Sequence, residues 1–130
     1  MRTLSAAHPY QMPIKTDYDV VVVRQHVRQM ARDLGLELSQ QAKIATAIST
    51  VARALIAMNC STTIWMRTED IGPQPALVLS CNLPAKQISD DLTQLEQRLH
   101  FGAARALVDE ATLTLDGNEA LLSLRIWLRR

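Results

Sequence analysis

The chain has 130 residues, enough for one ordinary domain, and 48% of them are hydrophobic, so a single buried core can form. Its 14 basic and 13 acidic residues leave a net charge of +1, which gives no electrostatic argument for binding nucleic acid or an anionic membrane. Aromatic residues make up only 4% of the chain, which disfavours a base-stacking surface.

The N-terminal part predicts a flexible segment over residues 1–11, a short strand at 12–16 and a helix at about 20–34. The apolar residues of this helix recur at helical spacing: Val20, Val23, Val27, Met30, Ala31 and Leu34. Gly35 ends the helix, because glycine readily adopts the left-handed conformation that follows many helices.

Arg24, Arg28 and Arg32 are spaced four residues apart and therefore share another face of this helix. Such a row is usually a solvated stripe. It is also compatible with a partner-docking surface, because arginine is enriched at protein interfaces.

A second helix follows at about 39–58, with Ser39 as its N-cap and a wide apolar face that predicts deep burial. Strands are predicted at 62–67 and 76–80, and a third, continuous helix at 91–108. The apolar side of the third helix consists of Leu92, Leu95, Leu99, Ala103 and Leu107.

The C-terminal part predicts a β-hairpin that turns tightly at Asp116 and Gly117. In its last strand Leu122, Leu124, Ile126 and Leu128 share one face, and Leu121, Ser123, Arg125, Trp127 and Arg129 share the other. The order of strands and helices predicts an α/β (α+β) fold, a two-layer sandwich in which one mixed sheet carries helices on one face.

Neither a membrane span nor a secretory leader is expected. The densest apolar run covers only residues 20–23, and the first fifteen residues lack the apolar core of a signal peptide, so we expect a cytoplasmic protein. Cys60 and Cys81 form no CxxC pair and are interpreted as reduced, buried thiols, with a disulfide or a reactive thiol as the alternative. His8, His26 and His100 have no metal-ligand spacing.

Two stretches resemble a known family. The first, "DVVVVRQHVRQMARDLGL…SQQAKIATAISTVARALI", resembles the first two helices of the GHKL-type, histidine kinase-like ATPase (Bergerat) domain, in particular the small RsbT-type serine kinases and anti-sigma factors of bacterial partner-switching pathways. The second, "GAARALVDEATLTL…LSLRIWLR", resembles the C-terminal part of the same family. The resemblance covers about residues 12–130, which predicts one such domain in a reduced form.

The family binds ATP and magnesium through residues that this chain lacks. The position of the catalytic glutamate on the second helix holds Thr50, which cannot act as a carboxylate base, and the position of the magnesium-binding asparagine holds Ala54. The adenine-binding aspartate falls near Asn82, and the glycine-rich turn beside it becomes "NLPAK", with Lys86 where a glycine belongs.

The phosphate-closing loop of the family is also changed. Its glycine-rich sequence becomes "EQRLHFG", which retains only Gly102 and is typical of a continuous helix. Arg98, His100 and Phe101 would place side chains where the phosphates lie in the family. Base, metal ligand, adenine acceptor and phosphate loop are all disturbed, so we expect no bound nucleotide, no metal and no catalytic residue.

Three functions stay open. The resemblance implies a pseudokinase that regulates by protein–protein binding, with a STAS-domain antagonist, a phosphatase or a sigma factor as its partner. The alternatives are an active ATP-dependent serine/threonine kinase and a structural or assembly domain unrelated to partner switching, with a homodimer as one form of it. Arg53 is either a packed structural residue or a partner contact, and Lys86 with Arg98 could hold an anion.

Overall fold

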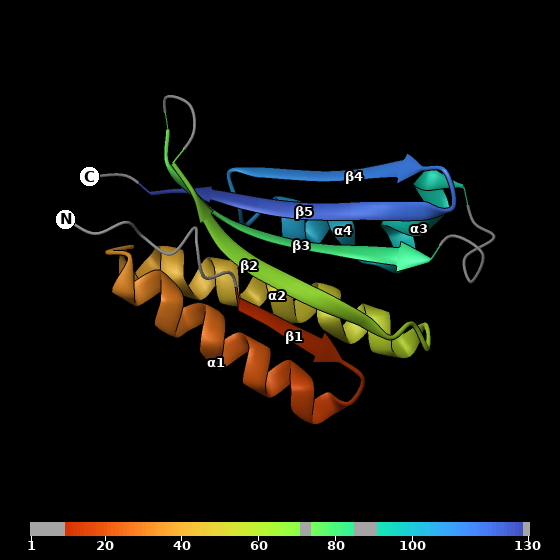
Figure 1. The fold of residues 1–130 in the computed structure, drawn as a ribbon, viewed down its shortest axis with the longest axis horizontal. Helices are drawn as coiled ribbons and strands as arrows, with labels where there is room; N and C mark the ends of the chain where they lie inside the picture. Colours follow the sequence, from red (N-terminus) through yellow and green to blue (C-terminus); the bar gives the residue numbers. More distant parts are fainter. Residues whose placement is uncertain (1–9, 71–73, 85–90, 129–130) are drawn as a thin grey trace.

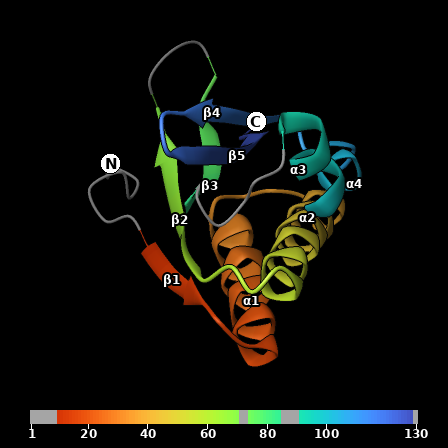
Figure 2. The same ribbon diagram turned by 90° about the vertical axis from the view of Figure 1, so that its right-hand side faces the viewer.

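The computed structural model describes residues 10–70, 74–84 and 91–128. A five-stranded sheet is covered on one face by all of the described helices, and its other face is open (Figures 1 and 2). The elements in chain order are β1 (Tyr10–Ile14), α1 (Asp17–Asp33), α2 (Leu38–Ala57), β2 (Thr62–Glu69), β3 (Ala76–Pro84), α3 (Leu92–Arg98), α4 (Phe101–Arg105), β4 (Glu110–Asp116) and β5 (Glu119–Trp127).

The predicted two-layer sandwich is confirmed, but the sheet is not mixed. Its strand order is β1-β2-β3-β5-β4, and all four pairings between described strands are antiparallel. Helices α1 and α2 connect β1 to β2. The start of β2 lies beside the end of β1, where Thr62 pairs with Ile14, and β2 runs in the opposite direction. After α3 and α4, β4 runs parallel to β3, but β5 pairs between them and removes the parallel contact.

The first strand begins earlier than predicted. Residues 1–9 of the expected flexible segment lie outside the described residues, whereas Tyr10 and Gln11 already belong to β1 and pair with Met66 and Trp65 of β2. The Tyr10 ring also meets the ring of His26 edge-on, with 3.9 Å between the ring centroids. These contacts with β2 and α1 make Tyr10 part of the folded structure.

Helix α1 has defined ends. The side chain of Thr16 accepts a bond from the Asp19 N–H, and Asp19 Oδ2 accepts one from the Thr16 N–H at 3.0 Å, which completes a capping box. At the C-terminal end Gly35 has φ +86° and the Leu36 N–H bonds to the Ala31 carbonyl, a Schellman ending. The predicted role of Gly35 is therefore confirmed.

Helix α2 has its N-cap two residues earlier than the sequence suggested. Glu37, not Ser39, is the N-cap, and Gln40 Oε1 accepts a bond from the Glu37 N–H at 3.2 Å. Ser39 lies inside the first turn, because Gln40 supplies the capping acceptor from further along. The helix ends at Ala57, and two residues later Asn59, with a φ of +56°, lets the Cys60 N–H reach the Leu55 carbonyl.

The third predicted helix is broken. Instead of one helix over 91–108, α3 and α4 are separated at His100, which adopts a left-handed conformation with φ +53°. Leu99 and Phe101 are both fully buried. In a continuous helix they would point about 200° apart, so only a break lets both face the core. The break also buries Ala104 in place of the predicted Ala103, which is exposed.

The core lies between the sheet and the helices. The predicted alternation of the last strand is confirmed, with Leu122, Leu124 and Ile126 at most 3% exposed. Cys60 and Cys81 are free, buried thiols, as expected. Burial, followed by the nearby Cys60 thiol, raises the pKa of Cys81 to about 12, so Cys81 stays protonated and unreactive near neutral pH.

Candidate functional site

Thr50 and Ala54, which stand at the catalytic glutamate and magnesium-binding asparagine positions in the sequence resemblance, lie together on α2. Thr50 is half-buried, and Ala54, one turn later, is 5% exposed and belongs to the hydrophobic core. The methyl group of Ala54 offers no oxygen to a divalent cation, and the hydroxyl of Thr50 carries no charge. These positions contribute packing to α2.

Asn82 does not join them. Side chains alternate along β3, and its neighbours Cys81 and Leu83 face the helices, so Asn82 points to the open face of the sheet. There it is exposed, and its Nδ2 donates to Glu119 Oε1 at 3.3 Å. The sheet therefore separates Asn82 from Thr50 and Ala54. Lys86, which the resemblance aligned with a glycine of the turn beside Asn82, lies outside the described residues.

The segment that would correspond to the phosphate loop packs on α2. Arg98 is exposed at the end of α3, and His100 provides the break. The buried residues of α4 are Phe101 and Ala104, and α4 contacts α2 directly. The guanidinium of Arg105 lies 4.9 Å from the centre of the Phe101 ring, a cation–π contact that covers the ring from the solvent side.

The described side chains do not gather into a cluster suited to a metal ion. In the stretches 10–70, 74–84 and 91–128, no three His, Cys, Asp or Glu side chains come together as potential ligands. None of the helices in these stretches has the length and apolar character needed to cross a membrane.

Helices α1 and α2 pack so that a groove forms on the surface between them, and this groove is the candidate binding site. It encloses about 220 Å³ and is lined by Val20, Val21, Arg24, Gln25, Arg28 and Arg53. The three arginines come from both helices, and Val21 adds an apolar surface that is 51% exposed. None of the three guanidinium groups forms a hydrogen bond or ion pair with any described residue. The groove therefore combines unneutralised positive charge with an apolar wall.

The sequence indicated only part of this groove. Arg24 and Arg28 belong to the predicted arginine row, but Arg32 does not line the groove and instead donates to Gln29 on its own helix. Arg53 is exposed on α2, so of its two predicted roles the packed one is wrong. Its position beside Arg24 depends on how α1 and α2 pack.

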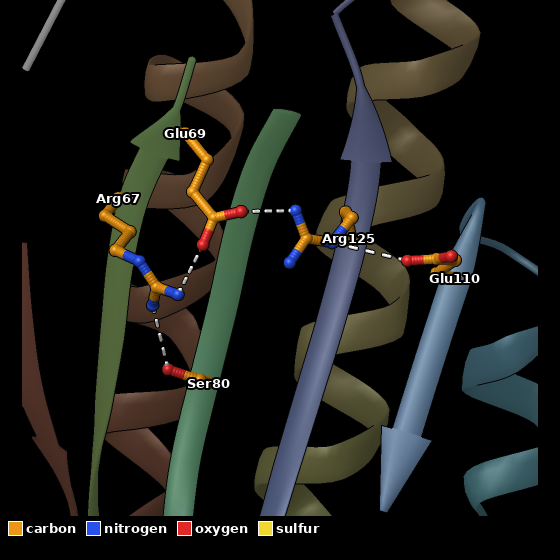
Figure 3. A network of polar contacts seen from close by, with 5 residues as sticks. All are labelled: Arg67, Glu69, Ser80, Glu110 and Arg125. Atoms are coloured by element: carbon orange, nitrogen blue, oxygen red, sulfur yellow. Dashed lines mark hydrogen bonds and ion pairs between the residues drawn. The ribbon is translucent and has the colours of Figure 1, made fainter. Parts of the chain in front are cut away.

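The open face of the sheet carries a polar network that the sequence did not reveal (Figure 3). Glu69 accepts bonds from Arg125 and from Arg67, the latter at 2.8 Å, and Arg125 Nε lies 3.4 Å from Glu110 Oε1. The hydrogen bonds from Arg125 and then Arg67 lower the pKa of Glu69. Val78 of β3 pairs with Arg67 of β2 on one side and with Arg125 of β5 on the other. Val78 is fully buried, so the network covers this part of the open face.

Comparison with known proteins identifies the fold. No protein-family model and no curated protein matches the sequence. Among solved structures the chain is similar to the crystal structure of the RsbU and RsbW domains of Rv1364c from Mycobacterium tuberculosis, with a TM-score of 0.65 and 17% sequence identity. The match covers 91% of this chain and 32% of that longer chain. The likeness is one of fold, and it confirms the predicted histidine kinase-like (Bergerat) two-layer fold.

Proposed function

We propose that this chain is a cytoplasmic regulatory protein that acts by binding another protein and has lost the nucleotide site of its fold. The observation that carries the proposal is the groove between α1 and α2, where Arg24, Arg28 and Arg53 present positive charge without a partner among the described residues. Unpaired arginines around an apolar wall are typical of interface anchors.

The positions that hold ATP in the family support the loss of the nucleotide site. Ala54 cannot ligate magnesium, and Asn82 lies on the opposite face of the sheet from Thr50. In addition, α4 packs directly on α2, and its Phe101 is buried. A nucleotide on this side of α2 would have to displace that packing.

The charge of the groove indicates the kind of partner. Three guanidinium groups favour an acidic surface, and the exposed Val21 favours an apolar side chain at its centre. The family resemblance implies a STAS-domain antagonist, a phosphatase or a sigma factor. Binding in this groove would compete with other partners of such a protein without depending on nucleotide.

Titration with Mg²⁺ and ATP tests the loss of the nucleotide site. We expect neither heat of binding in calorimetry nor a shift in melting temperature at millimolar nucleotide. A functional site would stabilise the fold by about 2.7 kcal/mol at a hundredfold excess over the dissociation constant. A shift of that size, or phosphate transfer to a STAS-domain protein, would favour the alternative function as a serine/threonine kinase.

Charge reversal in the groove tests the binding function. Arg24→Glu, Arg28→Glu and Arg53→Glu together should abolish capture of STAS-domain proteins and sigma factors from the same organism. Arg32→Glu is the matched control, because Arg32 lies on α1 but outside the groove. Binding that survives the triple change, or is lost equally in the control, contradicts the proposed use of this groove.

A further inference from the structure

Strand β4 forms one edge of the sheet (Figures 1 and 2). It pairs only with β5, and five of its seven residues are exposed. Apart from the ladder to β5, the backbone of Glu110–Asp116 has no backbone partner among the described residues. One side of this strand therefore presents backbone N–H and C=O groups that an added strand could pair with.

The edge is unprotected, in contrast to the opposite edge of the sheet. Strand β1 carries Pro13 near its centre, which removes a backbone donor, and the rings of Tyr10 and His26 tie it to α1. The centre of β4, residues 111–115, contains neither proline nor charge. Its register to β5 runs without a bulge from Glu110 to Asp116. The centre of β4 therefore lacks the usual devices that block edge pairing, and the charges of the strand lie at its two ends.

The charges around β4 indicate what it can pair with. Residues 109–119 contain four acidic side chains, Asp109, Glu110, Asp116 and Glu119, and no basic one. If two copies of β4 paired antiparallel about Leu113, Glu110 of each would lie opposite Asp116 of the other. Like charges directly opposite destabilise a strand pair, so a second copy of this chain is disfavoured.

We propose that the free edge of β4 binds an extended segment of another protein by strand addition, and that this segment carries Lys or Arg on both sides of a β-branched or apolar centre. Backbone pairing supplies the affinity, and the acidic ends of β4 select the basic flanks. Leu115, 53% exposed, offers an apolar contact beside the edge. This edge attracts basic segments, whereas the arginine groove attracts acidic surfaces, so the two sites select different partners.

A pair of synthetic peptides tests the proposal. One has the sequence Lys-Thr-Val-Thr-Val-Thr-Lys, and the other has Glu in place of both Lys residues; each carries a fluorescent label. We expect the lysine peptide to bind in anisotropy titrations, and to slow amide hydrogen exchange in residues 110–116. The glutamate peptide should not bind. Equal binding of both peptides, or no binding of either, overturns the proposal.

Substitution at the edge provides the second arm. Thr114→Lys places a positive charge at the exposed centre of β4 and should weaken binding of the lysine peptide about tenfold, or about 1.4 kcal/mol. Thr46→Lys, at an exposed position on α2, makes the same charge change and should have no effect. Equal weakening in both variants contradicts the edge site.

The oligomeric state and the groove variants separate the remaining explanations. A concentration-dependent dimer that Thr114→Lys dissociates in sedimentation experiments would assign β4 to a second copy of the chain and overturn the proposed occupant. The groove triple variant should bind the lysine peptide as the wild type does. Failure of the proposed groove function therefore leaves this test intact.

Discussion

The two helical pairs of this domain differ in how firmly their local sequence defines them. Helices α1 and α2 have 17 and 20 residues, and each is followed by a residue with a positive φ, Gly35 and Asn59 respectively. Helices α3 and α4 have only seven and five residues and are separated by His100, which adopts a conformation that glycine usually supplies. Packing, more than local propensity, therefore holds the second pair.

The two helical pairs cover the same sheet but contribute differently to the molecule. The first pair builds most of the helical layer and presents the arginine groove on its surface. The second pair contains the segment that the sequence resemblance aligned with a phosphate loop, and it uses Leu99 and Phe101 to extend the core. Under the proposed function, the first pair binds the partner and the second pair stabilises the fold.

The largest expected effect is the loss of a core side chain from the first pair. Ile48→Ala should lower the free energy of unfolding by about 2–5 kcal/mol, because Ile48 is 1% exposed and a rigid helix cannot collapse into the cavity. Leu95→Ala in α3 should cost less, because a short helix can move inward. Urea unfolding with an unchanged m-value measures both. Equal losses of unfolding free energy in Ile48→Ala and Leu95→Ala would contradict the view that the second helical pair is held less rigidly than the first.

The helix caps give an intermediate effect. Thr16→Ala should lower the global free energy of unfolding by about 1 kcal/mol, because α1 loses its N-cap acceptor. Asp91→Ala removes the acceptor of the Gln94 N–H at 2.9 Å in α3. Its main effect should be faster amide exchange confined to α3 and α4. Global destabilisation by Asp91→Ala as large as that by Thr16→Ala would argue that both pairs unfold as one unit.

The break between α3 and α4 predicts a stabilising substitution. His100→Gly should raise the free energy of unfolding by about 0.5 kcal/mol, because glycine relieves a left-handed strain of about 1–2 kcal/mol but loses about 0.5–1 kcal/mol more entropy on folding. Gly35→Ala, at φ +86°, is the opposite control and should destabilise. A destabilised His100→Gly variant, measured by thermal unfolding, would mean that the imidazole makes a required contact.

The smallest expected effect concerns pH. Backbone bonds from Lys15 and then Thr16 lower the pKa of Asp19 from its ordinary value of 3.8. Because the folded pKa lies below the unfolded one, the contribution of Asp19 is present above pH 3.8 and is lost as the pH falls through the folded pKa.

Asp19→Asn should therefore show a shallower loss of stability with acid than the wild type, followed by circular dichroism. The corresponding position in the α3 capping box is Gln94, which does not titrate, so this position makes no pH-dependent contribution to stability in α3. An identical acid profile for the variant and the wild type would contradict the role of the Asp19 carboxylate.

Much of the fold followed from local pattern. The spacing of Val20, Val23 and Val27 located α1, and the alternation of the last strand placed its core face. The helix break at His100 was not predictable in this way, because apolar residues at 95 and 99 match a continuous helix. Only the requirement to bury Leu99 and Phe101 together reveals it.

The candidate site was predicted less completely. Thr50 and Ala54 share a helix, so their one-turn spacing placed them together, but Asn82 came from an alignment that could not fix its side of β3. A shift of one residue in a strand moves a side chain to the other face. The meeting of Arg53 with Arg24 and Arg28 depends on the packing of two helices, which no local pattern specifies.

By itself the sequence determined the order of helices and strands apart from the break at His100, the C-terminal end of α1 and the absence of an oxygen ligand at position 54, because each of these depends on neighbouring residues along the chain. The tertiary structure alone decided the antiparallel sheet, the face on which Asn82 lies, the arginine groove and the free edge of β4. Each of the latter joins residues far apart in the sequence, so it is fixed by which surfaces pack together.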